Sequence, residues 1–133
     1  MSDTLPEDPR EIIRAGDATR RAVLGDAHVN RSTADPGAWE RPFVEMITDA
    51  AWGRTWSRDT LTKRERSMLT LALLAGLGNF EEFRLHLRAT ANTGATREDV
   101  LDVLLHVAVY AGVPRANHAI KLAKEIFREM EKS

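Results

Sequence analysis

The sequence of 133 residues contains no cysteine. This absence excludes thiol nucleophiles, Cys-x-x-Cys redox pairs, disulfide frameworks, zinc ribbons and iron–sulfur clusters. Net charge is also almost absent: acidic and basic residues nearly cancel to a formal value of −1. No global positive field is therefore available to hold a phosphate backbone or an anionic membrane, and nucleic-acid binding is disfavoured.

Long apolar runs are missing as well. No stretch approaches the roughly 18 apolar residues of a membrane span. The first ten residues, MSDTLPEDPR, are polar and acidic, whereas a secretory signal begins basic and then turns apolar. We therefore expect a soluble, cytoplasmic protein without membrane attachment.

The chain divides into a short arm and one helical domain. Residues 1–12 contain two prolines and four acidic side chains but few large apolar ones, so they are expected to form a flexible arm. Residues 13–133 are expected to form the domain, with a loop over 30–39. Apolar residues recur there at helical spacing, and no segment shows the alternation of a strand. The helices are predicted near residues 17–29, 41–53, 63–75, 79–92, 97–111 and 114–132.

Helix-capping patterns support these boundaries. Thr62 and Glu65 have the spacing of a capping box, as do Thr96 and Asp99. Gly94 is suited to a left-handed helix cap. Because the later helices are joined by very short glycine turns, the fold is predicted to be all-α, with about six helices arranged in antiparallel hairpins.

Three of the predicted helices carry strong apolar patterns. The helices over 63–75 and 97–111 are too apolar to present a charged face to water, which favours burial against another subunit and hence a homo-oligomer. The helix over 41–53 is expected to point its apolar side chains inward, namely Phe43, Met46, Ile47, Ala50 and Ala51.

Two of the four histidines have neighbours that suit chemistry. His86 shares a helical face with Glu82, which can orient the imidazole or raise its pKa, although an ordinary surface ion pair explains the same spacing. His106 lies in an aliphatic segment with Asp102 and Tyr110 on its face. For each histidine alone, a core imidazole bonded to a carbonyl is the competing interpretation. No compact ligand spacing such as His-x-x-x-His occurs, so no metal site is predicted.

Aromatic and basic residues cluster before and within the third helix. Trp52 and Trp56 flank a short segment that is followed by Arg58, Arg64 and Arg66. Indole rings beside guanidinium groups can hold a small planar dianion, with arginine gripping carboxylates in bidentate fashion. The alternative is that the tryptophans close the core and the arginines are solvated.

Residues 59–114 resemble the carboxymuconolactone decarboxylase family. The resemblance is carried by RERS followed by a Leu/Ala run, by LHLRATANTG and by LLHVAVYAGVP, in that order and spacing. The upstream segments RRAVLGDAHVNRSTA and AWGRTWSRDTL are also similar to this family. Alkylhydroperoxidase-like members carry a Glu, a Cys-x-x-Cys and a His, and Glu65, Asn79, Glu82 and His86 take the corresponding places. Without cysteine, thiol peroxidase chemistry is excluded.

The resemblance implies a compact helical trimer or hexamer without a cofactor. It further implies that CO2 is removed from a carboxylated unsaturated lactone, a small dicarboxylate, to give an enol-lactone. The implied catalytic residues are His86, Glu65 and His106, and the implied substrate-binding residues are Arg66, Arg58, Trp52, Glu82 and Tyr110. Two alternatives stay open: a relative acting on another lactone or a β-carbonyl acid, and a non-catalytic oligomeric helical module.

Overall fold

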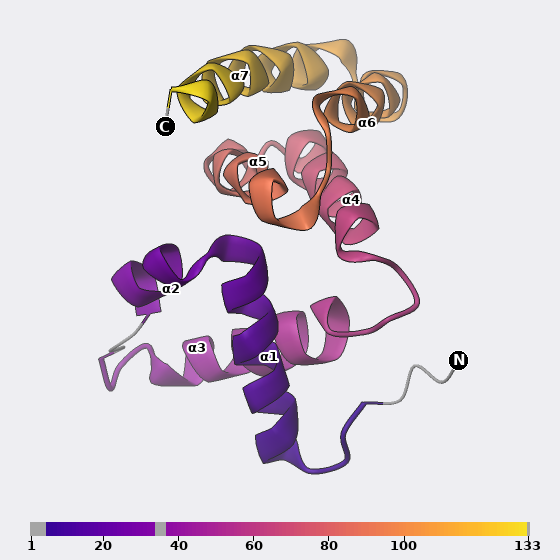
Figure 1. The fold of residues 1–133 in the computed structure, drawn as a ribbon. Helices are drawn as coiled ribbons and strands as arrows, with labels where there is room; N and C mark the ends of the chain where they lie inside the picture. The colour runs from indigo at the N-terminus through magenta and orange to yellow at the C-terminus, as the bar shows by residue number, and fades with distance from the viewer. Residues whose placement is uncertain (1–4, 34–36, 133) are drawn as a thin grey trace. The chain divides into compact units, whose positions relative to one another are not determined.

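The computed structural model describes residues 5–33 and 37–132 (Figure 1). Across these residues it contains seven α-helices, one π-helix and no strand, which confirms the predicted all-α class. The chain forms two compact units that meet at the Thr62–Lys63 boundary, within the segment expected to be one domain. None of the described helices is long and apolar enough to cross a membrane.

The first unit contains helices α1 (Pro9–Leu24), α2 (Asp26–Thr33) and α3 (Arg41–Ile47), and the π-helix η1 (Thr48–Trp56). Helix α1 begins inside the arm that was expected to reach residue 12. The Asp8 side chain caps it by accepting the Arg10 N–H at 2.9 Å, and Ile12 is only 3% exposed. A cap and one buried side chain thus order this part of the arm, whereas residues 1–4 lie outside the described residues.

Glycine separates α1 from α2. Gly25 has a φ of 91°, which ends α1, and the chain then continues as helix through Thr33. The loop predicted over residues 30–39 is therefore wrong in its first residues, while residues 34–36 lie outside the described part.

Helix α1 packs across η1 (Figure 1). Two glycines, Gly16 and Gly53, lie where the two helices approach each other. A methyl group at Gly16 would lie 2.8 Å from the Gly53 nitrogen, and one at Gly53 would lie 2.7 Å from the Ile12 carbonyl oxygen. The two backbones approach so closely that no side chain fits between them. These glycines are therefore required by packing rather than by chain reversal.

The π-helix changes which residues face inward. Its side chains bond five residues apart: Thr55 donates to the Ala50 carbonyl at 2.9 Å, and Arg54 pairs with Asp49 at 2.7 Å. Because this spacing departs from the 3.6-residue period, the inward face differs from the predicted one. Phe43 and Met46, also expected inside, lie in the preceding helix α3, which has no buried residue, and they are 60% and 58% exposed. The buried residues of the segment are Thr48, Trp52, Gly53 and Trp56.

The second unit contains helices α4 (Lys63–Leu77), α5 (Phe80–Thr93), α6 (Arg97–Tyr110) and α7 (Val113–Glu131). They match the four later helices that the sequence predicts. Gly94 ends α5 in the left-handed conformation, and Thr96 and Asp99 form the predicted capping box. Helix α4 begins directly after Thr62, where the other predicted cap places it.

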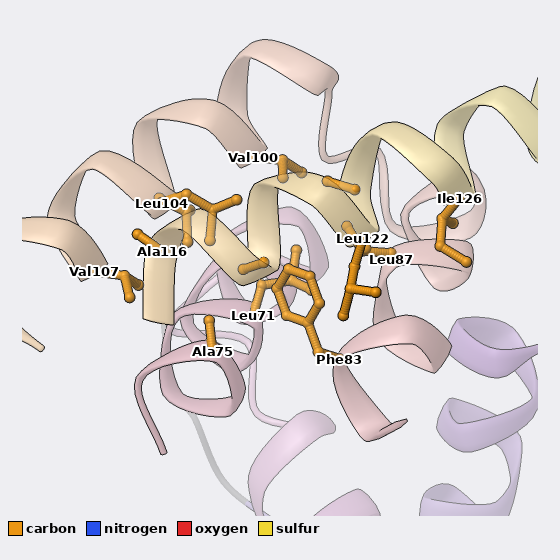
Figure 2. Packing of buried hydrophobic residues seen from close by; sticks show 13 residues of the cluster. Leu71, Ala75, Phe83, Leu87, Val100, Leu104, Val107, Ala116, Leu122 and Ile126 are labelled. Carbon is orange, nitrogen blue, oxygen red and sulfur yellow. The ribbon is translucent and has the colours of Figure 1, made fainter. Parts of the chain in front are cut away.

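All four helices share one apolar core (Figure 2). Leu71 and Phe83 are fully buried in it and project from α4 and α5. Leu104 and Ile126 project into the same core from α6 and α7. This core fixes the positions of the helices that carry the candidate site.

Helices α4 and α6 lie side by side and run parallel. At their first turns, Arg64 donates to both carboxylate oxygens of Asp99, at 2.8 and 2.6 Å. Near their last turns, a methyl group at Gly76 would lie 3.4 Å from the Ala111 Cβ. The ion pair and the small residues therefore hold the two helices together at both ends.

Candidate active site

Apolar side chains remain exposed on both α4 and α6. Leu69, Leu73 and Leu77 recur every four residues along one face of α4, and each is more than half exposed. Helix α6 has the same pattern in Leu101, Leu105 and Val109. The sequence predicted that helix 63–75 is too apolar to present a charged face to water, and its own unit covers only part of this helix.

A groove of about 380 Å³ lies between these two helices near their C-terminal ends. Its walls are almost entirely apolar, and His106 and Tyr110 supply its titratable groups. The lining residues from α4 are Ala72, Leu73, Gly76 and Leu77; those from α6 and its end are His106, Val107, Tyr110 and Ala111. Because Gly76 has no side chain, the groove keeps its depth between the helices.

His106 and Tyr110 are stacked on one turn of α6. Their ring centroids are 5.9 Å apart, with an angle of 27° between the planes. Both side chains are exposed, Tyr110 to 84%. A second groove on the other side of the same rings adds Asp102, Leu105 and Val109 to their surroundings. An imidazole and a phenol are thus presented to a small ligand on an apolar surface.

His86 has a different environment. It is 8% exposed on α5. Thr90, on the same helical face, is also buried, and its hydroxyl donates to the Leu87 carbonyl at 2.6 Å. Ser67 of α4 is fully buried. The buried polar side chains of α4 and α5 thus form an interior set that is distinct from the groove of His106.

The remaining candidates of this unit lie at helix ends. Glu65 and Arg66 occupy the first turn of α4, where Glu65 is exposed and Arg66 is half-buried. Glu82 is exposed in the first turn of α5. None of these three side chains lines the two grooves.

Trp52 and Arg58 belong to the first unit. Trp52 is 6% exposed, and its ring lies 5.3 Å from that of Trp56. Within this unit the two tryptophans therefore help close the core, as the competing interpretation held, whereas Arg58 is exposed. The structure brings together His106 and Tyr110 among the predicted site residues.

Two contributions to the site were missed from the sequence. The wall formed by Leu73, Gly76 and Leu77 depends on the parallel packing of α4 against α6, which no local pattern encodes. The two contacting pairs, Arg64 with Asp99 and Gly76 with Ala111, are each separated by 35 residues in sequence, as expected for parallel helices. This pairing becomes visible only in the folded structure.

The largest resolved pKa shift lies at the N-terminal ends of α4 and α6, at the opposite end of these helices from the groove. The Arg64 guanidinium, together with the Thr96 backbone N–H, lowers the pKa of Asp99 from 3.8 to about 2. Among the described residues, no group of three or more His, Asp or Glu side chains is arranged to hold a metal ion.

The chain matches known proteins over most of its length. The model of the Carboxymuconolactone decarboxylase family matches residues 41–125. A 4-carboxymuconolactone decarboxylase from Acinetobacter baylyi is 39% identical over 117 residues, which are 88% of this chain and 87% of the relative. Nitrosuccinic acid decarboxylase npaB from Metarhizium robertsii is 34% identical over 121 residues, 91% of this chain and 85% of the relative.

A third relative matches in a shorter segment. A 4-carboxymuconolactone decarboxylase from Pseudomonas putida is 46% identical over 46 residues, 35% of this chain and 96% of that sequence. The family model spans residues of both compact units, so the match does not depend on the C-terminal helices alone. The chain belongs to the carboxymuconolactone decarboxylase family.

Proposed function

We propose that this protein is a carboxy-lyase that converts 4-carboxymuconolactone into 3-oxoadipate enol-lactone and CO2 in protocatechuate breakdown. The observation that carries the proposal is the 39% identity to a 4-carboxymuconolactone decarboxylase over 88% of the chain. The groove of His106 and Tyr110 supports it, because it offers polar donors on an apolar wall.

The substrate supplies its own electron sink. One ring carbon of the unsaturated lactone holds the lactone oxygen, the departing carboxylate and an acetate arm. As the bond to the carboxylate breaks and CO2 leaves, the electron pair moves through the ring double bond into the lactone carbonyl, which gives a dienolate. A proton then adds to ring carbon to give the enol-lactone. The protein therefore has to donate to the developing oxyanion, protonate carbon and hold the remaining carboxylate.

We assign the oxyanion donor to His106, since its imidazole is exposed in the groove beside Tyr110. His86 and Glu65 are kept as the proposed proton donor and its orienting carboxylate. Arg66, Arg58, Trp52 and Glu82 are kept as proposed substrate-binding residues. The apolar wall favours loss of neutral CO2 over retention of a charged carboxylate.

A second substrate is favoured by one specific observation. The relative from Metarhizium robertsii that covers 91% of this chain is a nitrosuccinic acid decarboxylase. Nitrosuccinic acid has two carboxyl groups and a nitro group that can accept the electron pair released by decarboxylation. The same donors therefore suit an aliphatic nitro dicarboxylate.

We also propose that the protein is cytoplasmic and forms a homo-oligomer, a trimer or a hexamer as the family resemblance implies. The exposed apolar faces of α4 and α6 support self-association. In such an assembly, a second copy of the chain covers exposed leucines that lie outside the two grooves, namely Leu69 and Leu101. Burial of these faces also brings the groove of His106 close to a subunit contact.

A coupled ultraviolet assay tests the proposed function. 4-Carboxymuconolactone is generated in situ from 3-carboxymuconate, and enol-lactone formation is followed with and without the protein. We expect turnover well above the spontaneous rate, and a slower rate with nitrosuccinic acid. If nitrosuccinic acid is the better substrate, the second candidate replaces the first. If neither acid reacts faster than in buffer, both proposed substrates fail, and a panel of other lactones and β-carbonyl acids then separates a relative with another substrate from a non-catalytic helical module.

A further inference from the structure

The arginines of the second unit differ in whether they have a carboxylate partner. Seven arginines lie in residues 63–132. Four of them form ion pairs: Arg64 with Asp99, Arg84 with Glu125, Arg88 with Glu129, and Arg97 with Glu131. These pairs hold α6 and α7 to their neighbours, so their guanidinium groups are already engaged.

Arg115 differs from these four. Its side chain is exposed and makes no hydrogen bond or ion pair with any described residue. Helix α7 also has no acidic residue in its first turn, where Arg115 lies. A cation at the start of a helix is unfavourably placed relative to the helix dipole, so the stability of α7 does not explain this residue.

The guanidinium of Arg115 rests on the turn that ends α4. A methyl group added at Gly78 would lie 2.8 Å from the Arg115 Cζ atom, so the absence of a side chain at Gly78 is what makes room for the arginine. Gly78 follows Leu77, and Leu77 lines the groove of His106 and Tyr110. A guanidinium group without a carboxylate partner among the described residues therefore lies beside the turn that directly follows the groove lining on α4.

We propose that Arg115 binds the carboxylate of the acetate arm, the one that the substrate keeps. This inference rests on the proposed function and names the residue that holds the substrate in the groove. A guanidinium group can grip a carboxylate through two parallel hydrogen bonds. Neither arginine lines the groove itself, but Arg66, the arginine favoured by the sequence, lies in the first turn of α4, whereas Arg115 lies beside Gly78 at the end of α4 where the groove is.

The position of Arg115 also fits the direction of the reaction. A cation beside the departing carboxylate would stabilise a charge that disappears as CO2 forms, and so would stabilise the substrate more than the transition state. A cation on the retained carboxylate stabilises the substrate and the transition state equally, because that charge does not change in the reaction. Arg115, whose guanidinium group lies against Gly78 next to the groove residue Leu77, serves the second role, while His106 and Tyr110 face the reacting ring.

Steady-state kinetics separate these roles. Arg115→Gln is expected to raise the KM for 4-carboxymuconolactone by about 10-fold to 100-fold with little change in kcat, because uniform binding is lost. The KM of Arg115→Lys is expected to lie between those of the wild type and Arg115→Gln, since a single ammonium group cannot form two parallel hydrogen bonds to the carboxylate. The matched control is Arg128→Gln, another arginine on α7 that forms no ion pair within the described residues. An unchanged KM in Arg115→Gln, or a larger KM effect in Arg66→Gln, overturns the proposal.

A binding measurement keeps this inference distinct from the proposed reaction. The probe is the unsaturated lactone that keeps the acetate arm but lacks the departing carboxylate, titrated by calorimetry into the full-length protein. Arg115→Gln is expected to weaken binding at least tenfold, and Arg128→Gln to leave it unchanged. If the wild-type chain binds this lactone through Arg115 but does not decarboxylate the substrate, the reaction fails and the inference stands. Equal binding by wild type and Arg115→Gln, or no binding by either, refutes the inference whether or not turnover occurs.

Discussion

His106 is accessible where His86 is not. The imidazole of His106 lies in an apolar groove and stacks on Tyr110, whereas His86 is 8% exposed within the helical unit. A group that donates to a developing oxyanion has to reach the reacting atoms, so accessibility favours His106 for direct contact with the substrate.

We therefore predict that His106→Gln lowers kcat for 4-carboxymuconolactone by about 100-fold to 1,000-fold, the range typical of one lost oxyanion donor. The measurement is steady-state kinetics on variants whose oligomeric state is unchanged. The matched control is His118→Gln: His118 is exposed on α7, with its ring 4.3 Å from that of Phe80, and is expected to tolerate the change. A normal kcat in His106→Gln together with a large loss in His86→Gln would assign the donor to α5 instead.

Asp99 links stability to pH. Its pKa is 3.8 without the fold and about 2 in it, because Arg64 and the Thr96 backbone N–H favour the carboxylate. A lowered pKa stabilises the folded state fully above the unfolded value, and this contribution is lost as the pH falls toward 2.

The free energy of unfolding is therefore expected to fall between about pH 4 and pH 2 in the wild-type chain, and to fall less steeply in Asp99→Asn. Denaturant titrations at several pH values measure both slopes, and Glu98→Gln is the neighbouring control. Identical slopes in wild type and Asp99→Asn would show that the pair with Arg64 does not contribute to acid stability.

The sequence predicted which side chains could take part in the chemistry, but it did not predict what surrounds them. His106 and Tyr110 were selected because they lie one helical turn apart, and the structure places both in one groove. Arg115 carries no local pattern. It differs from the four ion-paired arginines of its unit, whose carboxylate partners lie 34 to 41 residues away in sequence and are revealed only by the fold.

Glycine plays different roles in different elements. Gly16 and Gly53 permit the crossing of α1 and η1, whereas Gly76 lies in α4 with 3.4 Å to the nearest Cβ of α6. A methyl group therefore fits at Gly76 with an ordinary van der Waals contact, whereas it does not fit at Gly16 or Gly53.

Gly16→Ala is expected to destabilise the chain by about 1–3 kcal/mol, because the new methyl group meets backbone atoms that cannot move aside. Gly76→Ala is the matched control, and its effect is expected to be neutral or stabilising by up to about 1 kcal/mol, since alanine is the better helix former. Chemical unfolding followed by circular dichroism compares the two. Equal stability of Gly16→Ala and wild type would refute the close crossing.

Helices with α-helical periodicity and clear caps were predictable, and the irregular ones were not. The four helices from Lys63 onward match the predicted segments because capping residues mark their ends, as Gly94 does at the end of α5 and Thr96 at the start of α6. The π-helix η1 was missed, since its spacing of five residues resembles no standard amphipathic pattern. Phe43 and Met46, which lie in the preceding α3, were also expected inside, although they are exposed.

At the scale of the whole molecule, the exposed leucines predict self-association. We expect the wild-type chain to be a trimer or a hexamer by light scattering, and Leu69→Glu with Leu101→Glu to form smaller species. Both leucines are about half exposed and neither lines the grooves of His106, so folding and groove geometry should survive. The control is Lys121→Glu on the exposed side of α7. A monomeric wild-type chain would contradict the proposed assembly.

The family could be identified from sequence because its motifs span both halves of the chain, and the family match confirms it. The assembly, by contrast, depends on surfaces whose partner is another molecule. The apolar excess of helices 63–75 and 97–111 predicts such a surface, and the exposed apolar faces of α4 and α6 are where we propose that it lies.

The most direct test of the account is to follow 4-carboxymuconolactone by NMR in D2O with the wild-type protein. The account predicts that CO2 and 3-oxoadipate enol-lactone form together, much faster than without protein, with deuterium entering the ring carbon beside the lactone carbonyl at early times. Consumption of the lactone at the protein-free rate would contradict the central claim, as would a product that still carries the carboxylate on its ring carbon.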